Sequence, residues 1–245
     1  MVTEEASQNL DRLSALIRFY EALAQLEYQL GGKKKLRECH GRMPWPRRGV
    51  YFFFEDGERR SHSGVGLRVT RVGTHAVSVA SKTTLWKRLA QHKGSMKSGG
   101  GNHRGSIFRS LVGEALLNRD ERSDIVTWGD GQSAPKEIRI GEHVLEAEVT
   151  NYLGNMPFLW MDVEDEPAVM SLRGYIEMNS IALLSNFGKS ASETLDAVSE
   201  NWLGSYSGRE QVIKSGLWNN RYVDKAYEPS FLQVLEQLVD NSCRG

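Results

Sequence analysis

The fold class depends on the stretch Gly49-Val50-Tyr51-Phe52-Phe53-Phe54, an unbroken apolar run rich in aromatic residues. Its β-propensity predicts a strand. The residues Glu55 to Glu58 predict a turn after it. Gly66 to Val72 predicts a second strand, after which Gly73 permits a bend, and Phe158 to Val163 predicts a further strand.

Helical periodicity surrounds these strands. Helices are predicted over Gln8–Leu30, Lys82–Lys93, Ile107–Leu117, Glu142–Leu153, about Ala168–Ser185 and Phe231–Val239. Ser81 is the predicted N-cap of the second helix, and Pro167 lies near the predicted start of the fifth. Asp120 to Gly141 predicts a loop with one or two short strands. These elements predict an α/β (α+β) protein with a small mixed or antiparallel sheet flanked by helices.

The chain divides into three predicted regions. Residues 1–46 hold the first helix, suited to packing or dimerisation, and a basic connector. Residues 47–189 form the core, with an insertion at about 97–156. Residues 190–245 form a C-terminal extension, in which Trp202 and Trp218 are the predicted anchors.

Composition excludes several classes of protein. The chain has 245 residues, of which 40% are hydrophobic and 25% charged, as in globular proteins. No apolar run approaches the ~18 residues of a membrane span, and the N-terminus lacks the apolar core of a signal peptide, so we expect a cytoplasmic protein. Cys39 and Cys243 cannot form a four-ligand zinc site, and a disulfide is not expected in that compartment.

The charge is unevenly distributed along the chain. Gly31 to Ser110 contains 18 lysines and arginines against four acids, and the rest of the chain has the opposite balance. A basic block favours a polyanionic partner, here DNA, over a merely solvated surface. The glycine-rich segment Gly94–Arg104 lacks the P-loop pattern, so no nucleotide cofactor is predicted. It is either a mobile loop or a loop that closes on phosphates.

Short motifs follow one another in a suggestive order. Gly49-Val50-Tyr51 opens the first strand, and Arg71-Val72-Gly73-Thr74 closes the second. The next helix presents Arg88 and, one turn later, His92, and the fifth contains Ile176-Glu177-Met178-Asn179-Ser180-Ile181. This order resembles the GIY-YIG nuclease superfamily over about residues 47–186, and the Arg88–His92 spacing resembles its restriction-endonuclease branch.

The resemblance implies metal-dependent cleavage of double-stranded DNA. Glu177 is then the metal ligand for Mg²⁺ or another divalent cation such as Mn²⁺. One carboxylate suffices because Mg²⁺ keeps several waters and accepts oxygens from its substrate. Tyr51 is the candidate general base, Arg88 offers a planar fork to the scissile phosphate, and His92 assists proton transfer or holds a phosphate.

The second motif departs from the family, because Arg71 stands where a tyrosine is usual. Either Arg71 contacts the phosphate or His75 takes the polar role. Further candidates for binding DNA or its phosphates are Lys87, Asn102, His103, Arg104 and Asn179.

Each residue also has a simpler explanation when taken alone. Tyr51 suits a core strand, Arg88 a solvated helix, and His92 a semi-buried position. Glu177 lies four residues after Arg173, so the two can pair across a helical turn. The alternatives to a DNA endonuclease of restriction or defence are a repair or mobile-element nuclease, and a non-cleaving DNA-binding or assembly module on a decayed nuclease scaffold.

Overall fold

A four-stranded sheet lies at the centre of the molecule. The computed structural model describes residues 4–169 and 171–241, and within them the sheet has the order β1-β4-β2-β3 with antiparallel pairing throughout. The strands are β1 (Lys34–Lys35), β2 (Gly49–Arg59), β3 (Leu67–Gly73) and β4 (Pro157–Asp162). The predicted fold class and the three predicted strands are confirmed. The turn predicted at Glu55 to Glu58 is wrong, because β2 continues through these residues to Arg59.

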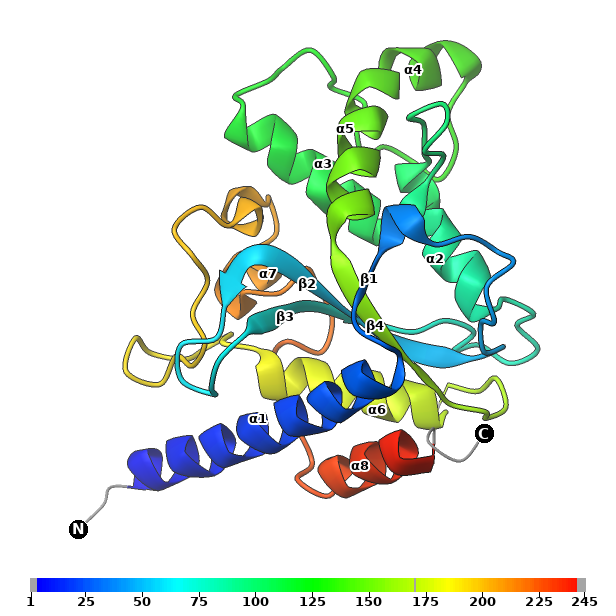
Figure 1. Cartoon of the computed structure of the whole chain (residues 1–245). Helices are drawn as coiled ribbons and strands as arrows, with labels where there is room; N and C mark the ends of the chain where they lie inside the picture. The colour runs from blue at the N-terminus through cyan, green and yellow to red at the C-terminus, as the bar shows by residue number, and fades with distance from the viewer. Residues whose placement is uncertain (1–3, 170, 242–245) are drawn as a thin grey trace.

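Helices cover both faces of this sheet (Figure 1). They are α1 (Glu4–Gln29), α2 (Leu85–Lys93), α3 (Ile107–Arg119), α4 (Lys136–Gly141), α5 (His143–Asn155), α6 (Leu172–Leu184), α7 (Glu210–Ser215) and α8 (Phe231–Asn241). Short 3₁₀ turns are η1 (Leu36–Glu38), η2 (His103–Gly105) and η3 (Leu203–Tyr206). Each helix predicted from the sequence is present.

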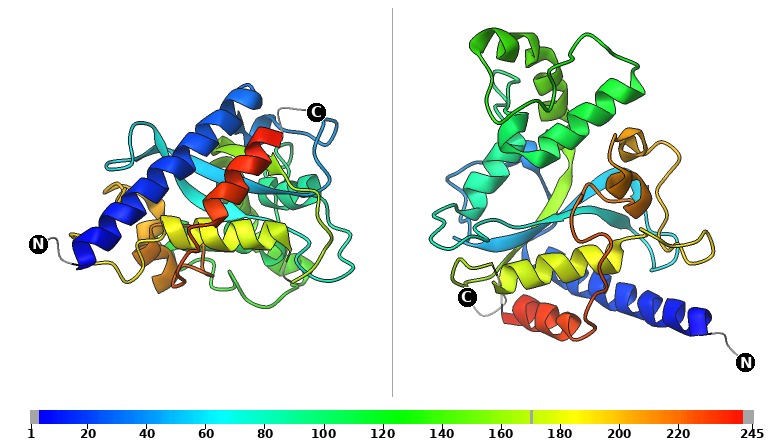
Figure 2. Two further views of the ribbon diagram at one scale, coloured as in Figure 1. Left: turned by 90° about the horizontal axis from the view of Figure 1, so that it is seen from below. Right: turned by 180° about the vertical axis from the view of Figure 1, so that it is seen from behind.

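Strand β2 explains why its sequence is apolar without alternation. Its side chains point alternately to the two faces of the sheet, and both faces are covered. Val50 and Phe52 pack in a core with α1, α6 and α8, whereas Tyr51 and Phe53 pack in a second core with α2, α3 and α5. Figures 1 and 2 show these two groups of helices on opposite sides of the sheet.

Two helix starts differ from the predictions. Thr84, not Ser81, caps α2, because its side chain accepts the Lys87 N–H. The prediction that a helix starts near Ala168 is also wrong, because α6 begins at Leu172 after the N-cap Ser171. The acidic residues before it are held outside the helix.

Two short segments were assigned wrongly or missed. No strand occurs within residues 120–141, where the structure instead has the short helix α4. Strand β1 was missed because two polar residues, Lys34 and Lys35, carry no periodicity. They become a strand only through pairing with β4 at Phe158 and Pro157.

The first and last helices pack on the same core. Helices α1 and α8 contact each other, and side chains of both share the core of the α6 face. In the C-terminal region the predicted anchors Trp202 and Trp218 are buried, and their indole N–H groups donate to Glu55 Oε1 at 3.1 and 2.7 Å. This anchors the extension on β2.

The structure bears on the expectations for the cysteines and for membrane-spanning helices. Cys39 is buried with a free thiol, and burial raises the pKa of that thiol to about 11. Cys243 lies outside the described residues. Among residues 4–169 and 171–241, no helix has the length and apolar character needed to span a membrane.

Candidate active site

Both motif glycines lie where backbones and rings approach too closely for a side chain. A Cβ on Gly49 would overlap the carbonyl oxygen of Met161 on β4, and a Cβ on Gly73 would overlap the phenol ring and hydroxyl of Tyr51. Tyr51 and Gly73 are direct partners in the β2–β3 ladder. The first and second motifs therefore meet side by side, and glycine is required for this contact.

The hydroxyl of Tyr51 is held inside the protein by His92. The hydroxyl oxygen lies 2.8 Å from His92 Nε2, and the other ring nitrogen, Nδ1, lies 2.7 Å from Ser106 Oγ. Both Tyr51 and His92 are fully buried. Burial, reinforced by Arg88, Arg71 and Arg109, holds the pKa of His92 well below its usual 6.5, so the ring is neutral at pH 7.

Arg71 lies on the same face of the sheet as Tyr51, because Arg71 pairs with Phe53 in the β2–β3 ladder. Its guanidinium donates to the Trp218 carbonyl and lies over the Phe108 ring at 4.5 Å. Burial lowers the pKa of Arg71, while the nearby Tyr51 and Glu177 oppose that shift. The residue in the position of the usual tyrosine therefore connects Tyr51 with Glu177.

Glu177 comes to the site on α6. The Thr74 N–H, just after β3, donates to Glu177 Oε1 at 3.1 Å. Burial raises the pKa of Glu177, opposed by Arg71, the Thr74 N–H, Arg88 and Arg221. The carboxylate is thus surrounded by positive charge.

Arg173 does not engage Glu177 in the structure. Its backbone N–H donates to Asp165 Oδ2 at 3.1 Å, its guanidinium pairs with the same carboxylate, and it also donates to the His75 carbonyl at 2.6 Å. The alternative in which Glu177 merely pairs with Arg173 is therefore not what the structure shows. Arg173 instead ties α6 to the segment after β3.

A pocket of about 400 Å³ opens over these groups. Its lining includes Arg71, Thr74, Arg88, Glu177, Asn220 and Arg221. Three of the candidate residues, from β3, α2 and α6, thus meet in one hollow. Tyr51 and His92 are buried and do not line the pocket.

Part of the pocket wall was missed from the sequence. The Asn219 side chain accepts the Val72 N–H at 3.1 Å and donates to the Val72 carbonyl at 2.8 Å, as a neighbouring strand would. This pairing brings Asn220, Arg221 and Tyr222 into the pocket wall. Hydrophobic periodicity gives no signal for such a contact, since it depends on one amide meeting an exposed strand edge.

The remaining candidates for DNA contact lie outside this lining. His75 and Asn179 are buried: His75 Nε2 lies 3.3 Å from the Arg47 carbonyl, and Asn179 accepts the Glu228 N–H at 2.7 Å. Lys87 is exposed on α2, and Asn102 is exposed at the N-cap of η2.

Two other candidates are held in internal contacts. His103 lies 3.0 Å from Glu146 through Nδ1 and stacks on Trp128 with ring centroids 3.8 Å apart. Arg104 pairs with Glu142 at 2.6 Å, and both side chains are buried. Their polar groups hold the region of α3 and α5 together.

The donor set of the pocket fits a hard divalent cation. In the described part of the chain, no group of three His, Cys, Asp or Glu side chains is placed to hold a metal ion. Among the described lining residues Glu177 is the one carboxylate. Mg²⁺ needs only one or two carboxylates when waters and phosphate oxygens complete its shell, so Glu177 would hold it.

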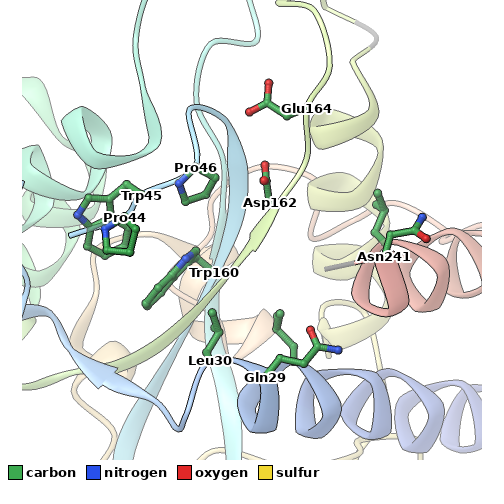
Figure 3. Close-up of a pocket in the computed structure, with 11 residues that line it drawn as sticks. Gln29, Leu30, Pro44, Trp45, Pro46, Trp160, Asp162, Glu164 and Asn241 are labelled. Carbon is green, nitrogen blue, oxygen red and sulfur yellow. The ribbon is translucent and has the colours of Figure 1, made fainter. Parts of the chain in front are cut away.

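A second pocket, of about 590 Å³, differs in charge. Figure 3 shows Trp45 and Trp160 on one side of it and Gln29 and Asn241 on the other, with Asp162 near Pro46. Asp162 and Glu164 line it, and burial together with Glu164 raises the pKa of Asp162. Two carboxylates repel phosphate, so the arginine-lined pocket is the better site for DNA.

Comparison with known proteins gives one match. A family model described as GIY-YIG domain matches residues 10–244, which is nearly the whole chain. No curated protein and no solved structure matches the chain.

Proposed function

The chain belongs to the GIY-YIG domain family, a family of nucleases, and on this premise we propose that it is a divalent-metal-dependent DNA endonuclease acting in restriction or defence. The observation that carries the proposal is that Arg71, Arg88 and Glu177 line one pocket. Arg71 also shares a face of the sheet with Tyr51, whose hydroxyl is hydrogen-bonded to His92. The four-residue spacing of Arg88 and His92 is what favours the restriction-type branch.

Arginines are suited to hold the scissile phosphate. Arg88 is partly exposed at the pocket, and its guanidinium is anchored by Gln91 Oε1 at 3.1 Å. Arg221 approaches from the C-terminal segment. A planar guanidinium binds two phosphate oxygens at once and stabilises the charge that develops on them during hydrolysis.

Glu177 would hold Mg²⁺ or Mn²⁺ beside that phosphate. When bound, the cation supplies positive charge to the phosphate oxygens and to the leaving 3′ oxygen. Arg71 and Arg88 oppose the rise in the pKa of Glu177, and so favour the ionised carboxylate that a metal requires.

Tyr51 and His92 accept the proton that the attacking water releases. As the water oxygen bonds to phosphorus and the bond to the 3′ oxygen breaks, the Tyr51 oxygen takes the water proton and passes its own proton to His92 Nε2. The Tyr51 oxygen and His92 Nε2 lie 2.8 Å apart, within reach for this transfer. Arg71, beside the phenol oxygen, stabilises negative charge there.

The test uses purified protein and supercoiled plasmid with Mg²⁺ or Mn²⁺. We expect nicking that EDTA stops, and Glu177→Gln should reduce nicking to the EDTA level while DNA affinity stays near that of the wild type. Glu164→Gln, at the other pocket, is the matched control and should cut normally. Nicking retained by Glu177→Gln would refute the metal-ligand assignment.

One observation favours the non-cleaving alternative. Tyr51 is fully buried and does not line the pocket, so water reaches its hydroxyl only if the surrounding side chains move when DNA binds. A wild-type protein that binds the plasmid and leaves it intact with both metals would establish a DNA-binding module in place of the nuclease.

A further inference from the structure

Ser106 lies behind His92, on the side away from Tyr51. Its side chain is buried at 1% exposure, and its Oγ lies 2.7 Å from His92 Nδ1. The same oxygen accepts the Arg109 N–H at 3.3 Å as the N-cap of α3. The cap fixes the position of the hydroxyl, and the hydroxyl in turn contacts the histidine ring.

The direction of this hydrogen-bond chain follows from which groups can only donate. Arg71 pairs with Phe53 in the β2–β3 ladder, so its side chain lies on the same face of the sheet as Tyr51. A guanidinium cannot accept a proton, and its positive charge favours a Tyr51 O–H that points away from it. His92 Nε2 at 2.8 Å is placed to accept that proton. A neutral ring that accepts at Nε2 carries its own proton at Nδ1, where Ser106 Oγ is the acceptor.

We propose that Ser106 is a positioning residue that holds His92 in the tautomer protonated at Nδ1, so that Nε2 is free to receive the Tyr51 proton. This inference rests on the proposed nuclease function. The transfer breaks the Tyr51 O–H bond and forms a His92 Nε2–H bond, while the Tyr51 oxygen gains the proton of the attacking water. Ser106 accepts the Nδ1–H hydrogen bond before and after the transfer and loses no atom.

The groups around His92 favour its neutral form. Arg88 acts on it from its own helix, Arg71 from β3 and Arg109 from α3, and Tyr51 faces it from β2. These cations keep the resting ring neutral. A serine oxygen orients such a ring without adding a charge of its own.

The tautomer is measured directly by ¹⁵N NMR of the labelled full-length protein without metal or DNA. A protonated and a bare imidazole nitrogen have well-separated shifts, and the His92 signals are assigned by their loss in His92→Gln. We expect Nδ1 protonated and Nε2 bare in the wild type, and a mixed or reversed tautomer in Ser106→Ala. A wild-type ring protonated at Nε2, or a Ser106→Ala ring that is unchanged, overturns the proposal.

Kinetics separate positioning from helix capping. Ser106→Ala should lower kcat for plasmid nicking at least about tenfold, which is part of the roughly 10²–10⁴-fold that general-base catalysis contributes in all, with KM unchanged. Ser106→Thr keeps a hydroxyl and a cap and should recover most of the activity. The control is Ser171→Ala, which removes another buried serine cap, that of α6. It should keep the wild-type pH–rate profile and tautomer.

The outcomes distinguish this proposal from the function on which it rests. A Ser106→Ala enzyme no slower than Ser171→Ala overturns the positioning role while the nuclease stands. A wild-type protein that never nicks DNA defeats the proposed function, and the NMR result still decides whether Ser106 fixes the ring.

Discussion

At the scale of single residues, the site depends on contacts that leave no spare volume. Gly73 is the clearest case, since the Tyr51 ring occupies the space into which a Cβ would project. The backbone of Gly73 lies outside the left-handed region. Close approach, and not conformational freedom, therefore explains the glycine.

Gly73→Ala should consequently displace Tyr51 from His92. We expect a loss of roughly 1–3 kcal/mol in the free energy of unfolding, as for other overpacked cores, together with loss of nicking. Urea denaturation measures the first and the plasmid assay the second. The control is Gly141→Ala, at the end of α4 with nothing within 4 Å of the new Cβ. A Gly73→Ala protein as stable as this control would show that the ring can yield.

His75 should make the stability depend on pH. Burial, together with Arg173, lowers the pKa of His75 to about 4. The unfolded chain, with a histidine pKa near 6.5, therefore binds the proton more readily between about pH 6.5 and 4. The free energy of unfolding should fall as the pH decreases through that window, by at most about 1.4 kcal/mol per pH unit for this one proton.

The measurement is urea denaturation from pH 7 to pH 4. His75→Gln should flatten part of the slope, whereas His143→Gln, at an exposed position on α5, should leave it unchanged. Equal slopes in the wild type and His75→Gln would mean that His75 titrates alike in both states.

At the scale of elements, the outer edge of β3 is completed by Trp218 and Asn219 in place of a further strand. The Trp218 backbone N–H donates to the Thr70 carbonyl at 2.7 Å, and the Asn219 side-chain amide pairs with both backbone groups of Val72. The segment that carries Arg221 is thereby fixed to the sheet. The contact that covers the edge of β3 therefore also forms one wall of the pocket.

Asn219→Ala should therefore affect stability and activity together. Leaving the Val72 N–H and carbonyl without partners in a buried position costs about 1–3 kcal/mol, and Arg221 loses its support. We expect a lower urea midpoint and weaker DNA binding. The neighbouring variant Asn220→Ala, which is partly exposed, should keep the wild-type midpoint. Equal midpoints for the two variants would contradict the argument.

The elements also show what the sequence can and cannot predict. Phe52 lies in an apolar run whose β-propensity indicates a strand, and Leu89 lies in a run whose period indicates a helix; both elements are present. Three features could not be predicted: the pairing of β1, the short helix α4, and the contact of Asn219 with Val72. They depend on partners distant in the chain, and local sequence patterns do not indicate such partners. Likewise the motif order predicted that Arg88 and Glu177 belong together, but not that Arg71 would share a face of the sheet with Tyr51.

At the scale of the whole molecule, the basic block is partly neutralised within the fold. Arg68 pairs with Glu58, Arg104 with Glu142, and Arg109 with Glu146, all with side chains less than a tenth exposed. These arginines support the structure and do not face solvent. The charge available to DNA is therefore smaller than the excess counted along the sequence.

The salt dependence of DNA binding should reflect this reduced charge. Each phosphate contact contributes about −0.9 to the slope of log affinity against log salt, and we expect a total slope of roughly −3 to −6. Fluorescence anisotropy of a labelled duplex with the Glu177→Gln protein measures it without cleavage. An affinity independent of salt would exclude the basic block as the binding surface.

The pairing of Asn219 with Val72 has a consequence for biosynthesis. Because the ribosome makes the chain from the N-terminus, β2, β3, α2 and α6 are all complete before the segment that closes the pocket wall has been translated. A nascent chain that has not yet reached Asn219 has an uncovered β3 edge and lacks Arg221. The candidate site is therefore assembled only after the chain has been synthesised beyond Arg221, so a translation product that stops before Asn219 holds the candidate motifs without the complete pocket wall.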